Sequence, residues 1–132
     1  MKHKLDSARN KNDEIALSFS NSFMNDSKYV KLLCALSESD LVIEDSRVKL
    51  IWDDEIREIY MDEITYEFDF YDHSMESMIG GYPKGWYEYK EIEWLELKSD
   101  AHQMERIIHL LNSIGQFETE LMDGVLRLYG YK

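Results

Sequence analysis

The stretch Asp100–Tyr131, DAHQMERIIHLLNSIGQFETELMDGVLRLYGY, decides the fold of this 132-residue chain. Asp100 followed by Gln103 has the pattern of a capping box at a helix start, and Gly115 is typical of a helix end. The apolar residues between them recur at the helical period and form one stripe, made of Met104, Ile107, Ile108, Leu111 and Ile114. The spacing therefore predicts a helix that packs one side on a core.

The second half of this stretch predicts a β-hairpin. Asp123-Gly124 is a strong two-residue turn signal, and apolar residues alternate on both sides of it, over 117–122 and 125–131. A two-residue turn places Glu120 opposite Arg127, and it places Leu121 opposite Leu126. Charged side chains then face charged side chains and apolar ones face apolar ones, so the predicted register is internally consistent.

Two segments upstream of the helix are predicted as strands. Trp86–Leu97 is apolar on both faces around Trp94 and Leu95, which indicates a central strand or a bulge. The glycines and proline at 80–85 predict a loop before it. Ile64–Asp72 alternates clearly: one predicted face is core (Ile64, Tyr66, Phe68, Phe70), and the other carries Thr65, Glu67, Asp69 and Tyr71.

A further strand is predicted at Arg47–Trp52, with Val48, Leu50 and Trp52 on its core side. A turn at 53–55 would return the chain as a hairpin in which Trp52 faces Arg57 and Leu50 faces Ile59. Residues 53–64 also fit a helical period, with Asp53 or Asp54 as the N-cap, so a helix competes with the hairpin here. Trp52 is interpreted as a core aromatic, together with Tyr29, Tyr66, Phe68 and Trp94.

The N-terminal part predicts two helices. The first covers 13–23 through Ile15, Phe19 and Phe23, although three serines and an asparagine dilute its helix propensity. The second begins at Asp26 or Ser27 and ends near Ser39, and its apolar stripe is Tyr29, Leu32, Leu33 and Leu36. With residues 1–12 as a flexible arm, 13–132 form a single α+β domain: N-terminal helices, a mainly antiparallel sheet, then a C-terminal helix and a β-hairpin.

Composition limits the classes of protein that fit. Cys34 is the only cysteine, so neither an internal disulfide nor a zinc site built on cysteine pairs is possible, and Cys34 itself is interpreted as a small hydrophobe. The polar N-terminus does not resemble a signal peptide, and no run of about 18 apolar residues occurs. We therefore expect a cytoplasmic protein that does not associate with membranes.

The net charge of -12 is concentrated in the middle of the chain. Residues 53–96 carry fourteen acidic and three basic residues, a net of -11, whereas both ends are nearly neutral. Such a field repels nucleic acid and speeds the encounter with basic proteins. We therefore expect a basic protein partner and no nucleic acid.

The histidines raise the question of a metal site. His102, Glu105 and His109 share one helix face at spacings of three and four, but the two histidines are seven residues apart, about 10 Å of helix rise. This separation favours a solvated polar face, and an enzyme or metalloprotein using these residues is kept as an alternative. We expect no metal, no cofactor and no catalytic residue.

The acidic segment is the best candidate for a binding surface, although a charged surface that serves only solubility is the competing interpretation. Aromatic residues beside it provide the rigid anchors that binding sites favour. The predicted partner-binding residues are Asp53, Asp54, Glu55, Asp62, Glu67, Asp69, Tyr71, Tyr82 and Trp86.

Three motifs carry a resemblance. The sequences MNDSKY (24–29), YKEIEWLEL (89–97) and IGQFETELMDGVLRLYGY (114–131) resemble a family of small bacterial proteins that is catalogued as a domain of unknown function. The resemblance covers about residues 22–132 and implies a fold but no catalytic residues. In size and charge the chain is also similar to the immunity proteins of contact-dependent and other polymorphic toxin systems, which implies a cytoplasmic inhibitor of a toxin domain such as a nuclease. A decoy that mimics DNA is the alternative function.

Overall fold

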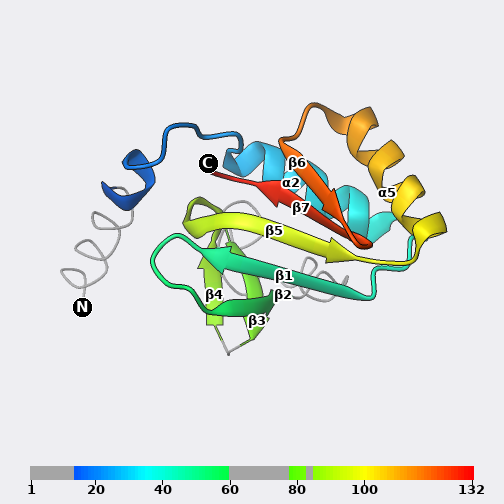
Figure 1. Cartoon of the computed structure of the whole chain (residues 1–132), viewed down its shortest axis with the longest axis horizontal. Helices are drawn as coiled ribbons and strands as arrows, with labels where there is room; N and C mark the ends of the chain where they lie inside the picture. The colour runs from blue at the N-terminus through cyan, green and yellow to red at the C-terminus, as the bar shows by residue number, and fades with distance from the viewer. Residues whose placement is uncertain (1–13, 60–77, 83–84) are drawn as a thin grey trace.

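The computed structural model describes residues 14–59, 78–82 and 85–132. Beyond a helical turn at 14–17, its elements are α2 (Asp26–Glu38), β1 (Asp45–Leu50), β2 (Ile56–Ile59), β3 (Met78–Tyr82), β4 (Gly85–Glu88), a 3-10 turn (Tyr89–Glu91), β5 (Ile92–Lys98), α5 (Ala101–Ile114), β6 (Thr119–Met122) and β7 (Val125–Tyr129). Figure 1 shows the two helices together on one side of the strands. The predicted α+β class and its order of elements are confirmed. The strand predicted at Ile64–Asp72 lies outside the described residues.

The strands form one sheet in the order β4-β3-β2-β1-β5-β7-β6, and each described pairing is antiparallel. Helices α2 and α5 cover one face of this sheet, because their apolar stripes join the buried strand residues in one cluster. From the strands the cluster contains Val48, Leu50, Leu95, Leu97, Leu126 and Leu128. The alternate residues of the same strands therefore face away from the helices.

Helix α2 has the predicted stripe and the predicted end. Tyr29, Leu32, Leu33 and Leu36 are all buried, and Ser39 is the C-cap. The predicted N-cap was wrong by one or two positions. Asn25 holds that position, and its side-chain oxygen accepts a hydrogen bond from the Lys28 backbone N–H at 2.8 Å, which satisfies a donor that the first helical turn leaves free.

The first predicted helix, 13–23, was wrong in length. Within the described residues it is helical only over 14–17, and the chain then becomes extended and joins the C-terminus. Asn21 and Lys132 exchange two backbone hydrogen bonds, the Phe23 N–H donates to the Gly130 carbonyl, and Ser22 forms an isolated β-bridge with Tyr131. These long-range bonds replace the helical ones in a segment whose serines and asparagine give the helix little support.

Helix α5 and the closing hairpin match the predictions. The Asp100 side chain caps α5 by accepting from the Gln103 N–H at 2.8 Å, and the helix ends at Gly115. Glu120 pairs with Arg127 and Leu121 pairs with Leu126, as expected. Asp123 and Gly124 have φ angles of 51° and 77°, which is the left-handed conformation that a two-residue turn between twisted strands requires.

The hairpin over 47–59 is confirmed, because residues 56–59 form a strand and not a helix. The predicted register of this hairpin was wrong. Arg57 pairs with Val48 instead of Trp52, a shift of four residues along β1. An even shift keeps each side chain on its predicted face. Strand β1 ends at Leu50, and Ile51 leaves the strand because its N–H donates to the Glu91 carbonyl at 2.7 Å.

Two predictions for residues 80–97 need correction. Gly80 and Gly81 belong to β3 and pair with β4 and β2, so the glycines do not mark a loop. The single strand predicted at Trp86–Leu97 is divided into β4 and β5 by the 3-10 turn at Tyr89–Glu91. Strand β5 is central, as its apolar faces predicted: it lies between β1 and β7, and the register shifts opposite it between Lys49 and Leu50.

Charges alternate across the sheet face that points away from the helices. Five residues stand directly opposite one another on β2, β1, β5, β7 and β6, in the order Glu58, Arg47, Glu96, Arg127 and Glu120. Opposite charges at directly facing positions stabilise a sheet. Arg127 also covers the Trp94 ring at 4.1 Å, so this aromatic residue is buried on the polar face.

Candidate functional site

The structure describes only part of the predicted binding surface. Asp53, Asp54 and Glu55 lie together in the loop between β1 and β2. Tyr82 ends β3 with its Cα opposite Glu58, and Trp86 lies in β4, where the backbone alone is described. Asp62, Glu67, Asp69 and Tyr71 lie outside the described residues. The site is therefore built from the β1–β2 loop and the residues that the fold brings to it.

Arg57 contacts three residues of this loop. Its guanidinium pairs with the Asp53 carboxylate and, at 3.4 Å, with that of Glu55, and it lies 4.9 Å from the Trp52 ring centroid. Burial lowers the pKa of Arg57, but hydrogen bonds with Tyr87 and Asp53 outweigh it, so the pKa is raised overall and the charge is secure. The loop is thus held in one conformation by a permanent cation.

Residues from the start of β5 complete the site, although they are about forty positions away in sequence. The Trp52 indole N–H donates to a Glu91 carboxylate oxygen at 3.3 Å. Lys49 joins the two segments, because its ammonium lies 3.1 Å from Glu93 and 3.9 Å from Asp54. Figure 1 shows the β1–β2 loop beside the turn that precedes β5. We call this surface the Trp52 corner, defined by Trp52, Asp53, Asp54, Glu55, Ile56, Glu91 and Glu93.

Trp52 is not the core residue that its alternation predicted. Its side chain is 44% exposed, and Ile56 beside the same loop is 51% exposed. The cause is the early end of β1: with Ile51 turned inward to the core, Trp52 falls in a turn outside the sheet. An exposed indole fixed by a hydrogen bond and a stacked guanidinium is a rigid anchor, which is what a binding hot spot needs.

The Trp52 corner keeps a surplus of negative charge after its internal pairing. Five carboxylates, those of Asp53, Asp54, Glu55, Glu91 and Glu93, surround the two cations Lys49 and Arg57, which leaves a net charge of -3. The Asp54 carboxylate is fully exposed. An exposed surplus of this kind attracts a cationic surface, and the interaction is screened by salt.

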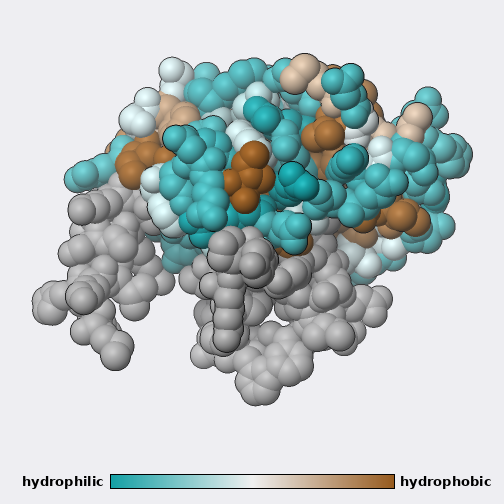
Figure 2. Space-filling model, turned by 60° about the horizontal axis from the view of Figure 1, so that its bottom comes forward, coloured by the Kyte–Doolittle hydropathy of each residue, from teal (hydrophilic) through white to brown (hydrophobic). Residues whose placement is uncertain are grey.

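The other described acids of the segment do not join this surface. Glu96 pairs with Arg127 at 2.8 Å within the alternating row, and Glu88 lies 3.8 Å from Lys90. Figure 2, which brings forward the underside of Figure 1, shows hydrophilic residues surrounding separate apolar spots. Among the described residues, Glu58 and Glu96 thus belong to the alternating row, and the Glu88 side chain lies beside Lys90, outside the Trp52 corner.

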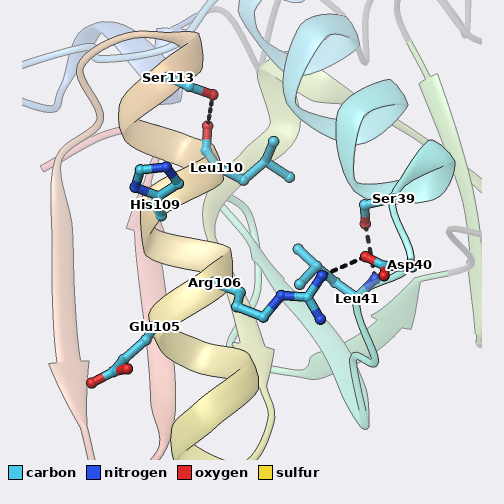
Figure 3. Close-up of a pocket in the computed structure, with 8 residues that line it drawn as sticks. All are labelled: Ser39, Asp40, Leu41, Glu105, Arg106, His109, Leu110 and Ser113. Carbon is cyan, nitrogen blue, oxygen red and sulfur yellow. Dashed lines mark hydrogen bonds and ion pairs between the residues drawn. The ribbon is translucent and has the colours of Figure 1, made fainter.

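Another pocket lies between α5 and the end of α2. It encloses about 420 Å³ and is lined by Ser39, Asp40, Leu41, Glu105, Arg106, His109, Leu110 and Ser113. Arg106 reaches across it and pairs with Asp40 at 2.6 Å, whereas Glu105 points away from that pair (Figure 3). The hydroxyls of Ser39 and Ser113 donate to backbone carbonyls, so neither serine donates to a general base here.

His102, Glu105 and His109 lie on α5 as predicted, and the first and last of them are exposed. In the described part of the chain, no three histidine, cysteine or carboxylate side chains come close enough to hold a metal ion. Cys34 is half-buried beside the α2 stripe, and burial raises the pKa of its thiol, which makes it a poor nucleophile.

Comparisons of the chain with protein-family models, with curated proteins and with solved structures find no match. Within the described residues no helix is both long and apolar enough to cross a membrane. The function of the Trp52 corner is therefore inferred from its own residues.

Proposed function

We propose that this chain is a non-enzymatic binding protein whose Trp52 corner docks on a basic protein. The observation that carries the proposal is an exposed, rigidly held indole within a surface of net charge -3. Charge of this kind speeds encounter, and the aromatic ring supplies the contact that keeps the complex together. Ile56, which follows the loop at the start of β2, is a second exposed apolar residue.

Preorganisation supports tight binding. The Trp52 indole donates a hydrogen bond to Glu91, and its ring contacts the Arg57 guanidinium. Arg57 in turn pairs with Asp53 and hydrogen-bonds with Tyr87. A side chain that is already ordered loses little entropy when a partner contacts it. The partner therefore meets a preformed surface and need not order the loop.

The kind of partner that we propose is a bacterial toxin domain, which makes this chain an immunity protein of the cytoplasm. The small size, the net charge of -12 and the similarity to immunity proteins in these properties support this proposal. A basic toxin, such as a nuclease that carries cations to bind phosphates, would match the Trp52 corner in charge. Inhibition would then follow from covering that cationic surface.

A DNA mimic is less well supported by the described surface. Such a decoy would present unpaired carboxylates in a row, but the row across the sheet alternates Glu58, Arg47, Glu96, Arg127 and Glu120. The two arginines cancel much of its field. A mimic would inhibit several unrelated DNA-binding proteins, whereas an immunity protein protects against its cognate toxin alone, so an inhibition panel separates the two.

The direct test is protection of growing cells. The C-terminal domain encoded by the reading frame next to this gene is expressed from an inducible promoter, with and without this chain. We expect the domain to arrest growth and the chain to restore it, while unrelated toxin domains are not neutralised. Undiminished arrest in the presence of the folded chain would overturn the immunity proposal.

Charge reversal at Asp54 should slow association. Asp54→Lys removes the most exposed carboxylate of the Trp52 corner and adds a cation, so we expect the association rate with the toxin domain to fall severalfold at low salt. The fall should shrink as salt is raised, because exposed charges are screened over about 8 to 10 Å at ordinary ionic strength. Stopped-flow or surface-based kinetics measure the rate.

Glu105→Lys provides the matched control. It changes the net charge by the same amount, but Glu105 is exposed on α5, which covers the opposite face of the sheet from the alternating row. We expect its association rate to stay close to that of the unaltered chain. Equal slowing by both variants would show that total charge, and not the Trp52 corner, governs encounter.

A further inference from the structure

A small cavity lies where α2 begins, away from the Trp52 corner. It has a volume of about 40 Å³ and is lined by Met24, Asn25, Asp26, Tyr29, Tyr89, Lys90, Gly130 and Tyr131. These residues come from the start of α2, the 3-10 turn and the C-terminal end of the chain. The cavity therefore sits at the junction of three segments that are distant in sequence.

The Tyr29 hydroxyl lines this cavity and has no hydrogen-bond partner among the described residues. Tyr29 is only 3% exposed, and its ring stacks on Tyr89 with centroids 4.9 Å apart. Leaving a buried hydroxyl unsatisfied costs about 1 to 3 kcal/mol. Gly130 also approaches closely, since a Cβ added there would lie 2.8 Å from the hydroxyl oxygen. The hydroxyl cannot swing out to solvent without moving these neighbours.

Volume and charge decide what the cavity can accept. The volume of about 40 Å³ exceeds the roughly 10 to 15 Å³ that a cavity needs to hold a water molecule, so the cavity admits one. The lining contains one acidic residue, Asp26, and one basic residue, Lys90, so it has no net charge to attract an ion. A neutral polar molecule fits such a lining.

We propose that the cavity binds a single structural water, which accepts or donates a hydrogen bond at the Tyr29 hydroxyl and links it to the polar groups at the start of α2. Buried waters commonly make about three hydrogen bonds to groups that would otherwise be unsatisfied. This water would complete the hydrogen bonding of a junction in which Phe23 and Gly130 are already joined by a backbone bond of 2.8 Å. The site is independent of the proposed function.

The substitution Tyr29→Phe tests the proposal by the sign of its effect on stability. If a water bonds the hydroxyl, removing the hydroxyl loses that bond, and we expect Tm to fall by about 3 to 6 °C. If the hydroxyl has no partner, its removal relieves an unsatisfied buried group, and Tm stays level or rises. The second result would overturn the proposal. Scanning calorimetry or circular dichroism measures the shift.

Tyr129→Phe is the control for loss of a tyrosine hydroxyl. Tyr129 donates to Glu120 at 2.9 Å on the exposed surface, where solvent can replace the lost bond, so we expect little change in Tm. A crystal structure at a resolution that places waters is the second measurement. It should show one oxygen about 2.6 to 3.2 Å from the Tyr29 hydroxyl oxygen. The proposal would be overturned if that hydroxyl bonded a protein group directly, or if no water oxygen lay within hydrogen-bond distance of it.

Discussion

Replacing Trp52 by alanine is expected to weaken binding to the proposed toxin partner by about 30-fold or more, the loss that a binding hot spot of about 2 kcal/mol gives. The physical reason is that Trp52 combines the largest apolar contact area of the Trp52 corner with a conformation fixed by Glu91 and Arg57. Most of the loss should appear as faster dissociation, because the carboxylates that attract the partner remain. Titration calorimetry gives the affinity, and surface-based kinetics give the rates.

Met122→Ala is the matched control for Trp52→Ala. Met122 is 62% exposed, and its partner Val125 pairs with Lys98 at the end of β5, whereas Trp52 lies beside Glu91 just before β5 begins. The β6–β7 turn next to Met122 and the β1–β2 loop that begins near Trp52 thus lie at opposite ends of the sheet, as the two turns do in Figure 1. We expect both variants to fold and Met122→Ala to bind normally. Unchanged affinity in Trp52→Ala, with Tm close to that of the unaltered chain, would remove the Trp52 corner as the docking surface.

Replacing Gly130 by alanine is expected to lower the free energy of unfolding by about 3 kcal/mol or more, which corresponds to a fall in Tm of about 10 °C or more. A Cβ at this position would lie 2.5 Å from the Ile92 carbonyl oxygen and 2.8 Å from the Tyr29 hydroxyl oxygen. The first contact is with backbone of the central strand β5, so it cannot be relieved by turning a side chain. Thermal and urea unfolding measure the loss.

Gly115→Ala tests whether the effect is specific to the close approach at Gly130. Nothing lies within 4 Å of a Cβ at Gly115, the residue that ends α5, and we expect a change within about 0.5 kcal/mol. If Gly130→Ala were as stable as Gly115→Ala, the packing of the C-terminal segment between β5 and Tyr29 would be wrong.

Local signals predicted the C-terminal half of the fold closely. Asp123-Gly124 fixed the turn, and its two-residue length then fixed the pairing of Glu120 with Arg127. Asp100 and Gly115 similarly bounded α5. In each case the decisive interaction joins residues that are close in sequence, so it can be seen without the rest of the chain.

Predictions were wrong where distant segments decide the local structure. Residues 18–23 form no helix because the backbone of Asn21 and Phe23 bonds the C-terminus. Gly80 is a strand residue because β2 and β4 flank β3, a context that outweighs its low strand propensity. Trp52 is exposed because the Ile51 N–H bonds Glu91, which ends β1 two residues early.

The same difference between local and distant interactions applies to the candidate site. Charge counting identified Asp53, Asp54 and Glu55, which are consecutive in the chain. It could not identify Glu91 and Glu93 as their neighbours, because only the pairing of β1 with β5 brings the two segments together. Trp52 was missed as a site residue because a regular alternation assigned it to the core. Its place immediately before three acidic residues was the signal that could have found it.

The alternating row across the sheet has an electrostatic consequence for how partners arrive. Its three carboxylates and two guanidinium groups nearly cancel, so the sheet face contributes little to the field at a distance. Within the described residues the surplus of the Trp52 corner then sits at one end of β1 and β5. Such an asymmetric distribution of charge is an electric dipole. The field of an approaching cationic protein exerts a torque on this dipole, which turns the Trp52 corner toward the partner before contact.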